Sequence, residues 1–238
     1  MSDASAPPSG DSNTYGQFRL EVLADWLRGQ GIIEHGALSC QPLTGGQSNP
    51  TFLLKNGKQE LVLRKKPPGV LMASAHAVDR EYRVMKALQN SDVPVPTLYA
   101  FSEDLEIVGT PFYLMEFLKG RVMVDQSLPD MSTAERGAVY EEMNRVIAAL
   151  HQVDPSAVGL ETFGKPGNYF QRQIARWSRQ YLEANTEHIE SLHALIEWLP
   201  QHIPAGDQTS IVHGDYRLDN LVFHPTQPRA LGLLDWEL

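Results

Sequence analysis

The sequence is poor in cysteine and contains no long apolar run. A single cysteine, Cys40, stands among 238 residues, so no internal disulfide can form, and a reducing compartment is expected. No apolar stretch approaches the roughly 18–20 residues that a helix needs to cross a bilayer. Residues 1–13 lack the cationic start and the apolar segment of a secretory signal. We therefore expect a cytoplasmic protein with no membrane partner.

Positive charge is also in deficit. There are 20 Lys and Arg residues against 29 Asp and Glu, which gives a formal net charge of −9. This balance argues against nucleic acid and anionic membranes as partners, while a local basic pocket for a phosphate remains compatible with it. With 42% hydrophobic and 21% charged residues, the composition is otherwise that of an ordinary globular protein. No Cys/His/Asn arrangement supports a catalytic thiol, so Cys40 is interpreted as a small packed residue.

The first half of the chain has the pattern of a sheet with an inserted helix. Residues 1–13 are rich in Ser, Pro, Ala and Gly, and we expect a disordered tail there. Between β-prone runs within 39–66, the pair Asn56-Gly57 predicts a tight hairpin turn. Helices are expected over about 18–27 and 75–89, and further strands over 97–102, 106–109 and 112–118. The sheet should be mainly antiparallel.

After Gly120 the pattern becomes helical. Residues 132–135 (STAE) have the form of a capping box and open the first of three expected helices. The large aromatic residues of these helices are interpreted as core or helix-packing residues: Trp177, Tyr181 and Trp198. Short strands are expected at 211–212, 221–223 and 230–234. We place the domain boundary at the change in composition, so that residues 14–119 and 120–238 form two domains after the tail at 1–13.

The most informative segment is HGDYRLDN at 213–220. It places Asp215 and Asn220 five residues apart after a His, and a later carboxylate, Asp235, ends the apolar run at 231–234. This matches the H-x-D-x-x-x-x-N layout and the later metal-binding Asp of kinase-like phosphotransferases. Asp215 fits the carboxylate that orients an acceptor hydroxyl and takes its proton. Asn220 and Asp235 fit the hard oxygen ligands that hold Mg²⁺ against nucleotide phosphates. The alternative is a polar turn formed by Asp and Asn.

Glu81 occupies an unusual position for a carboxylate. Val78, Glu81, Met85 and Leu88 follow helical spacing, so Glu81 falls within the apolar face of its helix. A buried carboxylate needs a buried cation, and Arg64 on the preceding strand is the best candidate. The alternative is that Glu81 lies at the edge of the apolar face and pairs on the helix surface with Arg80 or Lys86.

These motifs together resemble the aminoglycoside phosphotransferase and choline kinase family. The resemblance covers the chain from about residue 39 to its end, with VHGDYRLDNLV at 212–222 and LDWE at 234–237 as its motifs. The segment LRKKPPG at 63–69 resembles the branch found alone in bacteria or fused to acyl-CoA dehydrogenases. The resemblance implies an α+β, protein-kinase-like fold of two lobes. The first lobe would hold an antiparallel sheet with one helix, and the second, mainly helical, would continue past residue 238.

The resemblance also implies roles in the first lobe. Segment 44–49 resembles the nucleotide-positioning loop, whose expected contributors are Gly45, Gly46, Ser48 and Asn49; a hairpin glycine pair is the alternative. Arg64 stands where kinases carry a phosphate-binding lysine, and Lys65 or Lys66 could take that role instead. Glu81 would be its helix partner. Strand 112–118 resembles the hinge that holds adenine, through the carbonyl of Glu116 and the N–H of Leu118.

We therefore predict an ATP-dependent phosphotransferase that uses Mg²⁺ and acts on the hydroxyl of a small molecule. The branch suggests a hydroxyacyl-type or other metabolic alcohol. The alternative is a catalytically silent, pseudokinase-like nucleotide-binding module. A protein kinase is disfavoured because D-F-G and A-P-E motifs are missing. Neither the acceptor nor the oligomeric state follows from the sequence.

Overall fold

The computed structural model describes most of the chain, in seven stretches. They are residues 14–15, 18–43, 49–68, 78–165, 167–184, 187–206 and 209–236. The tail expected at 1–13, the first turn of the helix expected from 75, and the loop residues Gly45, Gly46 and Ser48 lie outside them. The chain divides into two compact units, Met1–Leu150 with Val212–Leu238, and His151–Ile211. The lobe boundary at 119–120 stays a prediction.

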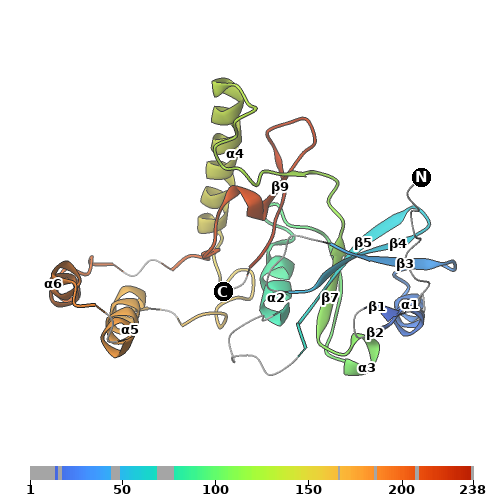
Figure 1. Ribbon diagram of the computed structural model, residues 1–238, viewed down its shortest axis with the longest axis horizontal. Helices are drawn as coiled ribbons and strands as arrows, with labels where there is room; N and C mark the ends of the chain where they lie inside the picture. Colours follow the sequence, from blue (N-terminus) through green and yellow to red (C-terminus); the bar gives the residue numbers. More distant parts are fainter. Residues whose placement is uncertain are drawn as a thin grey trace, which may run out of the picture. The chain divides into compact units, whose positions relative to one another are not determined.

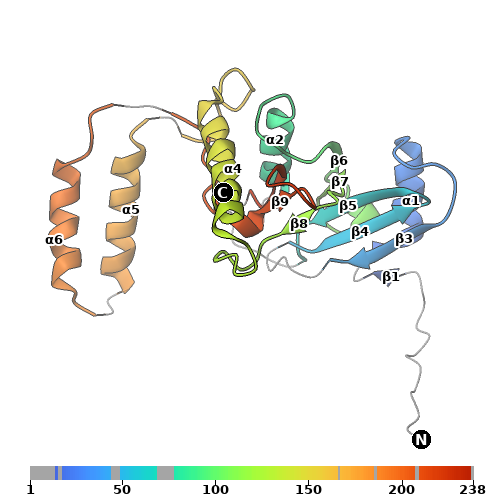
Figure 2. The ribbon, with the colours of Figure 1, turned by 90° about the horizontal axis from the view of Figure 1, so that it is seen from above.

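The first unit contains the expected antiparallel sheet, so the α+β fold class is confirmed. Five strands lie in the order β3-β4-β5-β7-β6, and every neighbouring pair is antiparallel (Figures 1 and 2). Their bounds are β3 Leu38–Pro42, β4 Thr51–Asn56, β5 Gln59–Lys65, β6 Leu98–Ser102 and β7 Phe112–Glu116. Ahead of the sheet, β1 (Thr14–Tyr15) pairs with β2 (Phe18–Arg19).

The turn between β4 and β5 confirms the predicted hairpin. Asn56 pairs with Gln59, so the connection is two residues long. Gly57 has φ 59°, the left-handed conformation that such a turn needs and that glycine adopts without steric cost. The same ladder pairs Thr51 with Arg64 and thereby sets the register of β5.

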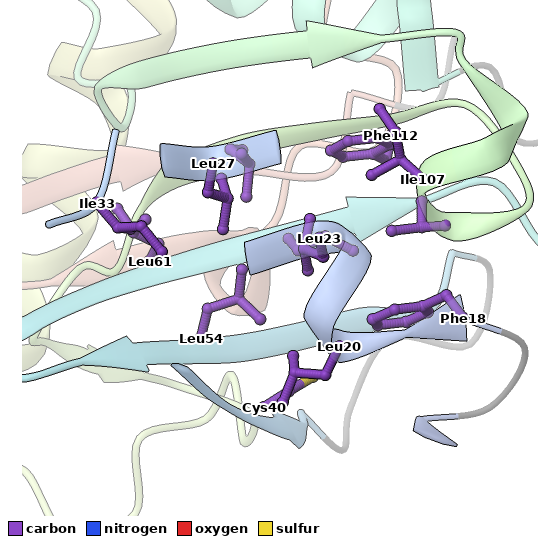
Figure 3. Close-up of a cluster of buried hydrophobic side chains, with 13 residues drawn as sticks. Phe18, Leu20, Leu23, Leu27, Ile33, Cys40, Leu54, Leu61, Ile107 and Phe112 are labelled. Carbon is purple, nitrogen blue, oxygen red and sulfur yellow. The ribbon is translucent and has the colours of Figure 1, made fainter. Parts of the chain in front are cut away.

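A helix covers each face of this sheet (Figure 1). On one face, α1 (Leu20–Gly29) packs Leu23 and Leu27 against Leu54, Leu61 and other buried residues (Figure 3). Fully burying a leucine side chain stabilises the fold by about 1.5–3 kcal/mol, so this cluster is the main core of the sheet. On the other face lies α2 (Val78–Leu88), which carries Glu81.

Cys40 belongs to the same buried cluster, as its interpretation as a packed residue requires. Burial raises the pKa of its thiol to about 12. A thiol that stays protonated is a poor nucleophile. The structure therefore gives Cys40 a packing role.

One predicted strand is wrong. Residues 106–109 were expected to be extended, but Leu105–Val108 forms the short helix α3. The Asp104 carboxylate accepts the N–H of Glu106 at 3.0 Å and caps the start of the helix. Gly109, with φ 81°, ends it in the left-handed conformation. The two caps outweigh the β propensity of the apolar residues between them.

A second, three-stranded sheet carries the C-terminal motifs. Its order is β10-β9-β8, with β8 at Arg121–Val122, β9 at Leu221–Phe223 and β10 at Ala230–Leu233. Helix α4 (Thr133–Gln152) begins as predicted. The N–H of Glu135 donates to the Ser132 hydroxyl at 3.3 Å, and the N–H of Ser132 donates to the Glu135 carboxylate at 2.8 Å. The strand expected at 211–212 is wrong: these two residues are not part of a strand, and Val212 is 54% exposed.

The second unit contains two neighbouring helices, α5 (Tyr169–Ala184) and α6 (Glu190–Trp198), and a 3-10 turn η1 (Leu199–Gln201) (Figure 2). Trp177 is 60% exposed and Trp198 is 51% exposed, so the core alternative is wrong for both. The helix-packing alternative stays open for them, and the Trp198 ring stacks on that of His202. Tyr181 does join the helices, since its ring meets that of His193. In the described part of the chain, no helix is long and apolar enough to cross a membrane.

Candidate active site

The loop that carries Asp215 is anchored by the buried histidine that precedes it. His213 Nε2 lies 2.8 Å from the carbonyl oxygen of Leu234, and because a carbonyl only accepts, Nε2 carries the proton. Burial lowers the pKa of His213, which keeps the imidazole neutral. Gly214 has φ 85°, which lets the chain turn directly after the anchor. The Tyr216 hydroxyl donates to the carbonyl of Met143 in α4 at 2.6 Å.

Asp215 and Asn220, which stand five residues apart, are in direct contact. Asn220 follows Leu218, which is fully buried, within the 3-10 turn η2 (Leu218–Asn220). Its Nδ2 donates to the Asp215 carbonyl at 2.7 Å and to the Asp215 carboxylate at 3.2 Å. With the nitrogen engaged, Oδ1 is the side-chain atom of Asn220 that remains to coordinate a cation.

Asp235 is tied to the same loop through the backbone. The N–H of Leu234 donates to the carbonyl of Asn220 at 2.9 Å, which holds the residue before Asp235 against the loop. Asp235 itself has φ 67°, a left-handed conformation uncommon for a residue with a side chain. Such conformations cluster at functional sites. The Asp235 carboxylate contacts the guanidinium of Arg64, so a positive charge already lies at this position.

Arg64 connects the sheet to both carboxylates. Its Nε lies 2.9 Å from Glu81 Oε2, and its Nη2 contacts Asp235. Glu81 is only 1% exposed and Arg64 is buried as well, so the predicted buried pair is present. Burial raises the pKa of Glu81, and the charge of Arg64 opposes that rise. Burial also disfavours the charged guanidinium, but Glu81 and Asp235 more than offset this and raise the pKa of Arg64, which stays positive.

Two further side chains complete the shell around Glu81. The Tyr113 hydroxyl donates to Oε2 at 2.7 Å, and Asn49 Nδ2 donates to Oε1 at 2.7 Å. Burial raises the pKa of Tyr113, and the nearby Glu81 charge adds to that rise, so the hydroxyl remains a donor. Asn49 was expected to face a nucleotide, whereas its side chain is 1% exposed and turned toward the carboxylate.

Lys65 does not share the Arg64 site. Successive side chains of a strand point to opposite faces, and Lys65 lies on the α1 face. There its Nζ donates to the carbonyl of Val108 and sits 5.1 Å from the centre of the Phe18 ring. Burial lowers the pKa of Lys65. Lys65 and Lys66 were the alternatives to Arg64 as the phosphate-binding residue. Because Lys65 lies on the α1 face, Lys66 is the alternative that remains.

The expected hinge residues lie at the end of β7. The Glu116 carboxylate accepts the Thr97 hydroxyl at 2.9 Å, and the Glu116 N–H donates to the Thr97 carbonyl at 2.8 Å. The carbonyl of Leu118 accepts the N–H of Gly120 at 3.0 Å. No contact tests the adenine-binding role of Glu116 and Leu118, which stays a prediction.

Sequence reasoning missed Arg217. Its Nε lies 3.4 Å from Asp215 Oδ2, and its Nη2 lies 2.8 Å from Asp219 Oδ2. An arginine between two aspartates of one loop was the available signal. The structure thus places a half-exposed cation beside the carboxylate assigned as base. Tyr113 was missed too, because a continuous apolar strand does not reveal which face its hydroxyl serves.

The residues present suit a magnesium nucleotide. Asn220 Oδ1 and the Asp235 carboxylate are hard oxygen donors, and the guanidinium at Asp235 shows that the position stabilises positive charge. Across the described stretches, no three His, Cys, Asp or Glu side chains cluster as a self-sufficient metal site. Proteins usually hold Mg²⁺ through one or two side-chain ligands, and phosphate oxygens of the substrate complete the coordination shell.

The fold and this loop define a kinase-like phosphotransferase architecture. The chain belongs to the phosphotransferase enzyme family, whose model matches residues 39–238. It is 47% identical over 219 residues to acyl-CoA dehydrogenase family member 10 of Mus musculus. The aligned region covers 92% of this chain and 20% of that protein. The chain thus spans about a fifth of that relative. The predicted resemblance, including its acyl-CoA dehydrogenase branch, is confirmed.

Two solved structures are also similar. A Ralstonia eutropha JMP134 protein, provisionally named an aminoglycoside phosphotransferase, is 56% identical with a TM-score of 0.83, covering 92% of this chain and 65% of that one. The streptomycin–ATP–APH(2")-IIa ternary complex is 20% identical with a TM-score of 0.61, covering 92% of this chain and 70% of that one. At that identity the second match supports the kinase-like fold alone.

Proposed function

We propose that the protein transfers the γ-phosphate of Mg·ATP to the hydroxyl of a small molecule. The observation that carries this proposal is the contact of Arg64 with both Glu81 and Asp235. Through this contact Arg64 of the sheet, Glu81 of α2 and Asp235 of the LDWE motif lie together. Asn220, bound to Asp215, lies on the loop tied to Leu234.

Each residue has a role in this proposal. Asn220 Oδ1 and Asp235 would hold Mg²⁺, which when bound supplies charge neutralisation for the phosphates. Arg64 would bind phosphate oxygens while Glu81 holds its other edge. Asp215, whose side chain is 62% exposed, would accept the proton of the acceptor hydroxyl as that oxygen bonds to phosphorus and ADP leaves.

The family branch supports a substrate class. Because a relative of this chain is named an acyl-CoA dehydrogenase, we take a hydroxyacyl-type alcohol as the proposed acceptor. A bound nucleotide without turnover would instead support the silent nucleotide-binding module.

The test separates binding from chemistry. Melting temperature is measured with ATP alone, Mg²⁺ alone and both; we expect a rise only with both, as linkage requires. ATP consumption is then screened against hydroxyacyl thioesters, free hydroxy acids and aminoglycosides. No shift at millimolar Mg·ATP would overturn the nucleotide site, and a shift without turnover on any alcohol would overturn the transferase. Asp130→Asn, at an exposed residue outside segment 213–220, is the control.

A further inference from the structure

The two carboxylate oxygens of Glu81 have different donors. Oε2 receives the Tyr113 hydroxyl at 2.7 Å and lies 2.9 Å from Arg64 Nε. Oε1 receives Asn49 Nδ2 at 2.7 Å. The donor identity is fixed by chemistry, because a carboxylate only accepts and Asn49 must therefore present its nitrogen. Asn49 thus controls the second oxygen of the carboxylate.

Arginine and carboxylate groups prefer to meet through two parallel contacts. Here Glu81 meets Arg64 through Nε, while Arg64 Nη2 contacts Asp235. If Oε1 were free, the carboxylate could rotate to take up a terminal nitrogen of Arg64 as well. That rotation would draw the guanidinium away from Asp235.

Asn49 makes this contact at some cost to stability. Its Oδ1 is buried and has no hydrogen-bond partner within the described stretches. A buried acceptor without a partner is unfavourable by about 1–3 kcal/mol. An apolar residue would avoid this, so the amide is better explained by its effect on Glu81 than by packing.

We propose that Asn49 is a positioning residue that holds Glu81 Oε1, so that Oε2 stays in ionic contact with Arg64 Nε and Arg64 keeps its terminal nitrogen Nη2 for the group beside Asp235. This inference rests on the proposed function only where it names that group as a phosphate. It replaces the expected direct contact of Asn49 with a nucleotide, since a side chain that is 1% exposed and bonded to Glu81 does not face an incoming ligand.

The first experiment needs no nucleotide. The Nε–Hε resonance of Arg64, identified by its loss in Arg64→Lys, is recorded by NMR in wild type, Asn49→Ala and Asn49→Asp. We expect it to shift and to exchange faster with water in both variants, and most in Asn49→Asp, where a second carboxylate faces Glu81. The control is Asn56→Asp, at another buried asparagine of the same strand region, whose Nδ2 donates to the Ala37 carbonyl at 3.3 Å. An unchanged Arg64 resonance in Asn49→Ala would overturn the proposal.

The second experiment is a double-mutant cycle on Mg·ATP affinity. Asn49→Ala should weaken binding about tenfold to a hundredfold, the range expected for a lost hydrogen bond to a charged group. In a Glu81→Gln background the same change should have little further effect, because Asn49 acts through Glu81. The KM for ATP should rise while the KM for the acceptor stays near wild type.

The outcomes are distinguishable. Equal losses in both backgrounds would mean that Asn49 touches the nucleotide directly and would overturn the positioning role. If wild type binds no Mg·ATP, the proposed function fails, and the Arg64 resonance still decides the role of Asn49. If Asn49→Asp does not fold, Asn49→Ala and Asn49→Ser carry the test, with melting temperature recorded for each.

Discussion

The guanidinium of Arg64 contacts the carboxylate of Asp235, a residue 171 positions further along the chain. The proposed metal ligand therefore has a cationic partner within the protein. A metal ion arriving alone must compete with Arg64. A metal ion arriving with phosphates offers Arg64 new oxygen partners in exchange. This contact predicts that metal and nucleotide bind together.

The first prediction concerns metal binding without nucleotide. Arg64→Gln should raise the affinity for Mn²⁺ by roughly fivefold or more, about 1 kcal/mol, because two carboxylates lose a shared cation. Arg64→Lys should stay near wild type, since it keeps the charge. The Mn²⁺ affinity of both variants is determined by measuring free Mn²⁺ with electron paramagnetic resonance. If the double variant Arg64→Gln, Asp235→Asn keeps the increased Mn²⁺ affinity of Arg64→Gln, the metal does not bind at Asp235.

The second prediction concerns the proposed base. Asp215→Asn should leave Mg·ATP affinity nearly unchanged and lower turnover by roughly 10²–10⁴, the usual range for a general base. Asp235→Asn should instead weaken binding of the metal nucleotide. Calorimetric titration and a coupled ATP assay separate the two effects. Full turnover in Asp215→Asn would show that another group takes the proton.

The third prediction concerns pH and His213. Burial lowers the pKa of His213 from 6.5, so the unfolded chain takes up a proton at a higher pH than the folded chain. Its contribution to stability is present above pH 6.5 and is lost as the pH falls from there toward the lowered value. Between pH 7.5 and 5.5, wild type should lose more unfolding free energy than His213→Gln in urea titrations. His35→Gln, at an exposed histidine, should behave like wild type; equal pH slopes in His213→Gln and wild type would contradict the prediction.

The fourth prediction contrasts two glycines. A Cβ on Gly120 would lie 2.3 Å from the backbone carbonyl oxygen of Phe223, so Gly120→Ala must push the segment after β7 away from β9. We expect a loss of about 1–3 kcal/mol in unfolding free energy. Gly137, inside α4, has nothing within 4 Å of such a Cβ, and Gly137→Ala should stabilise by about 0.4–1 kcal/mol. Equal effects in urea denaturation would refute the close approach at Gly120.

The parts of the fold that follow from local pattern were predictable. Gly57 supplies the positive φ that a two-residue hairpin turn requires, and Ser132 with Glu135 specifies a helix start. The helix Leu105–Val108 was missed because four apolar residues do not distinguish a strand from a single capped turn. The deciding residues, Asp104 and Gly109, flank the segment.

The site was predictable where charge and burial conflict. Glu81 on an apolar helix face demands a cation, and strand alternation offers Arg64 on the side opposite Lys65. The direction of Asn49 was not predictable, because a short polar residue after a glycine-rich segment suits a ligand loop and a buried contact equally well. Arg217 was missed because arginine in an exposed turn has no distinctive periodicity.

The two-residue turn at Gly57 has a consequence for how the chain tolerates change in length. Arg64 and Lys65 are neighbours that lie on opposite faces of β5, and the register set at the turn puts Arg64 on the face that meets Glu81. Inserting one residue there would send the short amine toward α2 and bury the guanidinium among leucines. An insertion or deletion at residues 57–58 should therefore abolish nucleotide binding, where one in the exposed loop at 125–127 is tolerated.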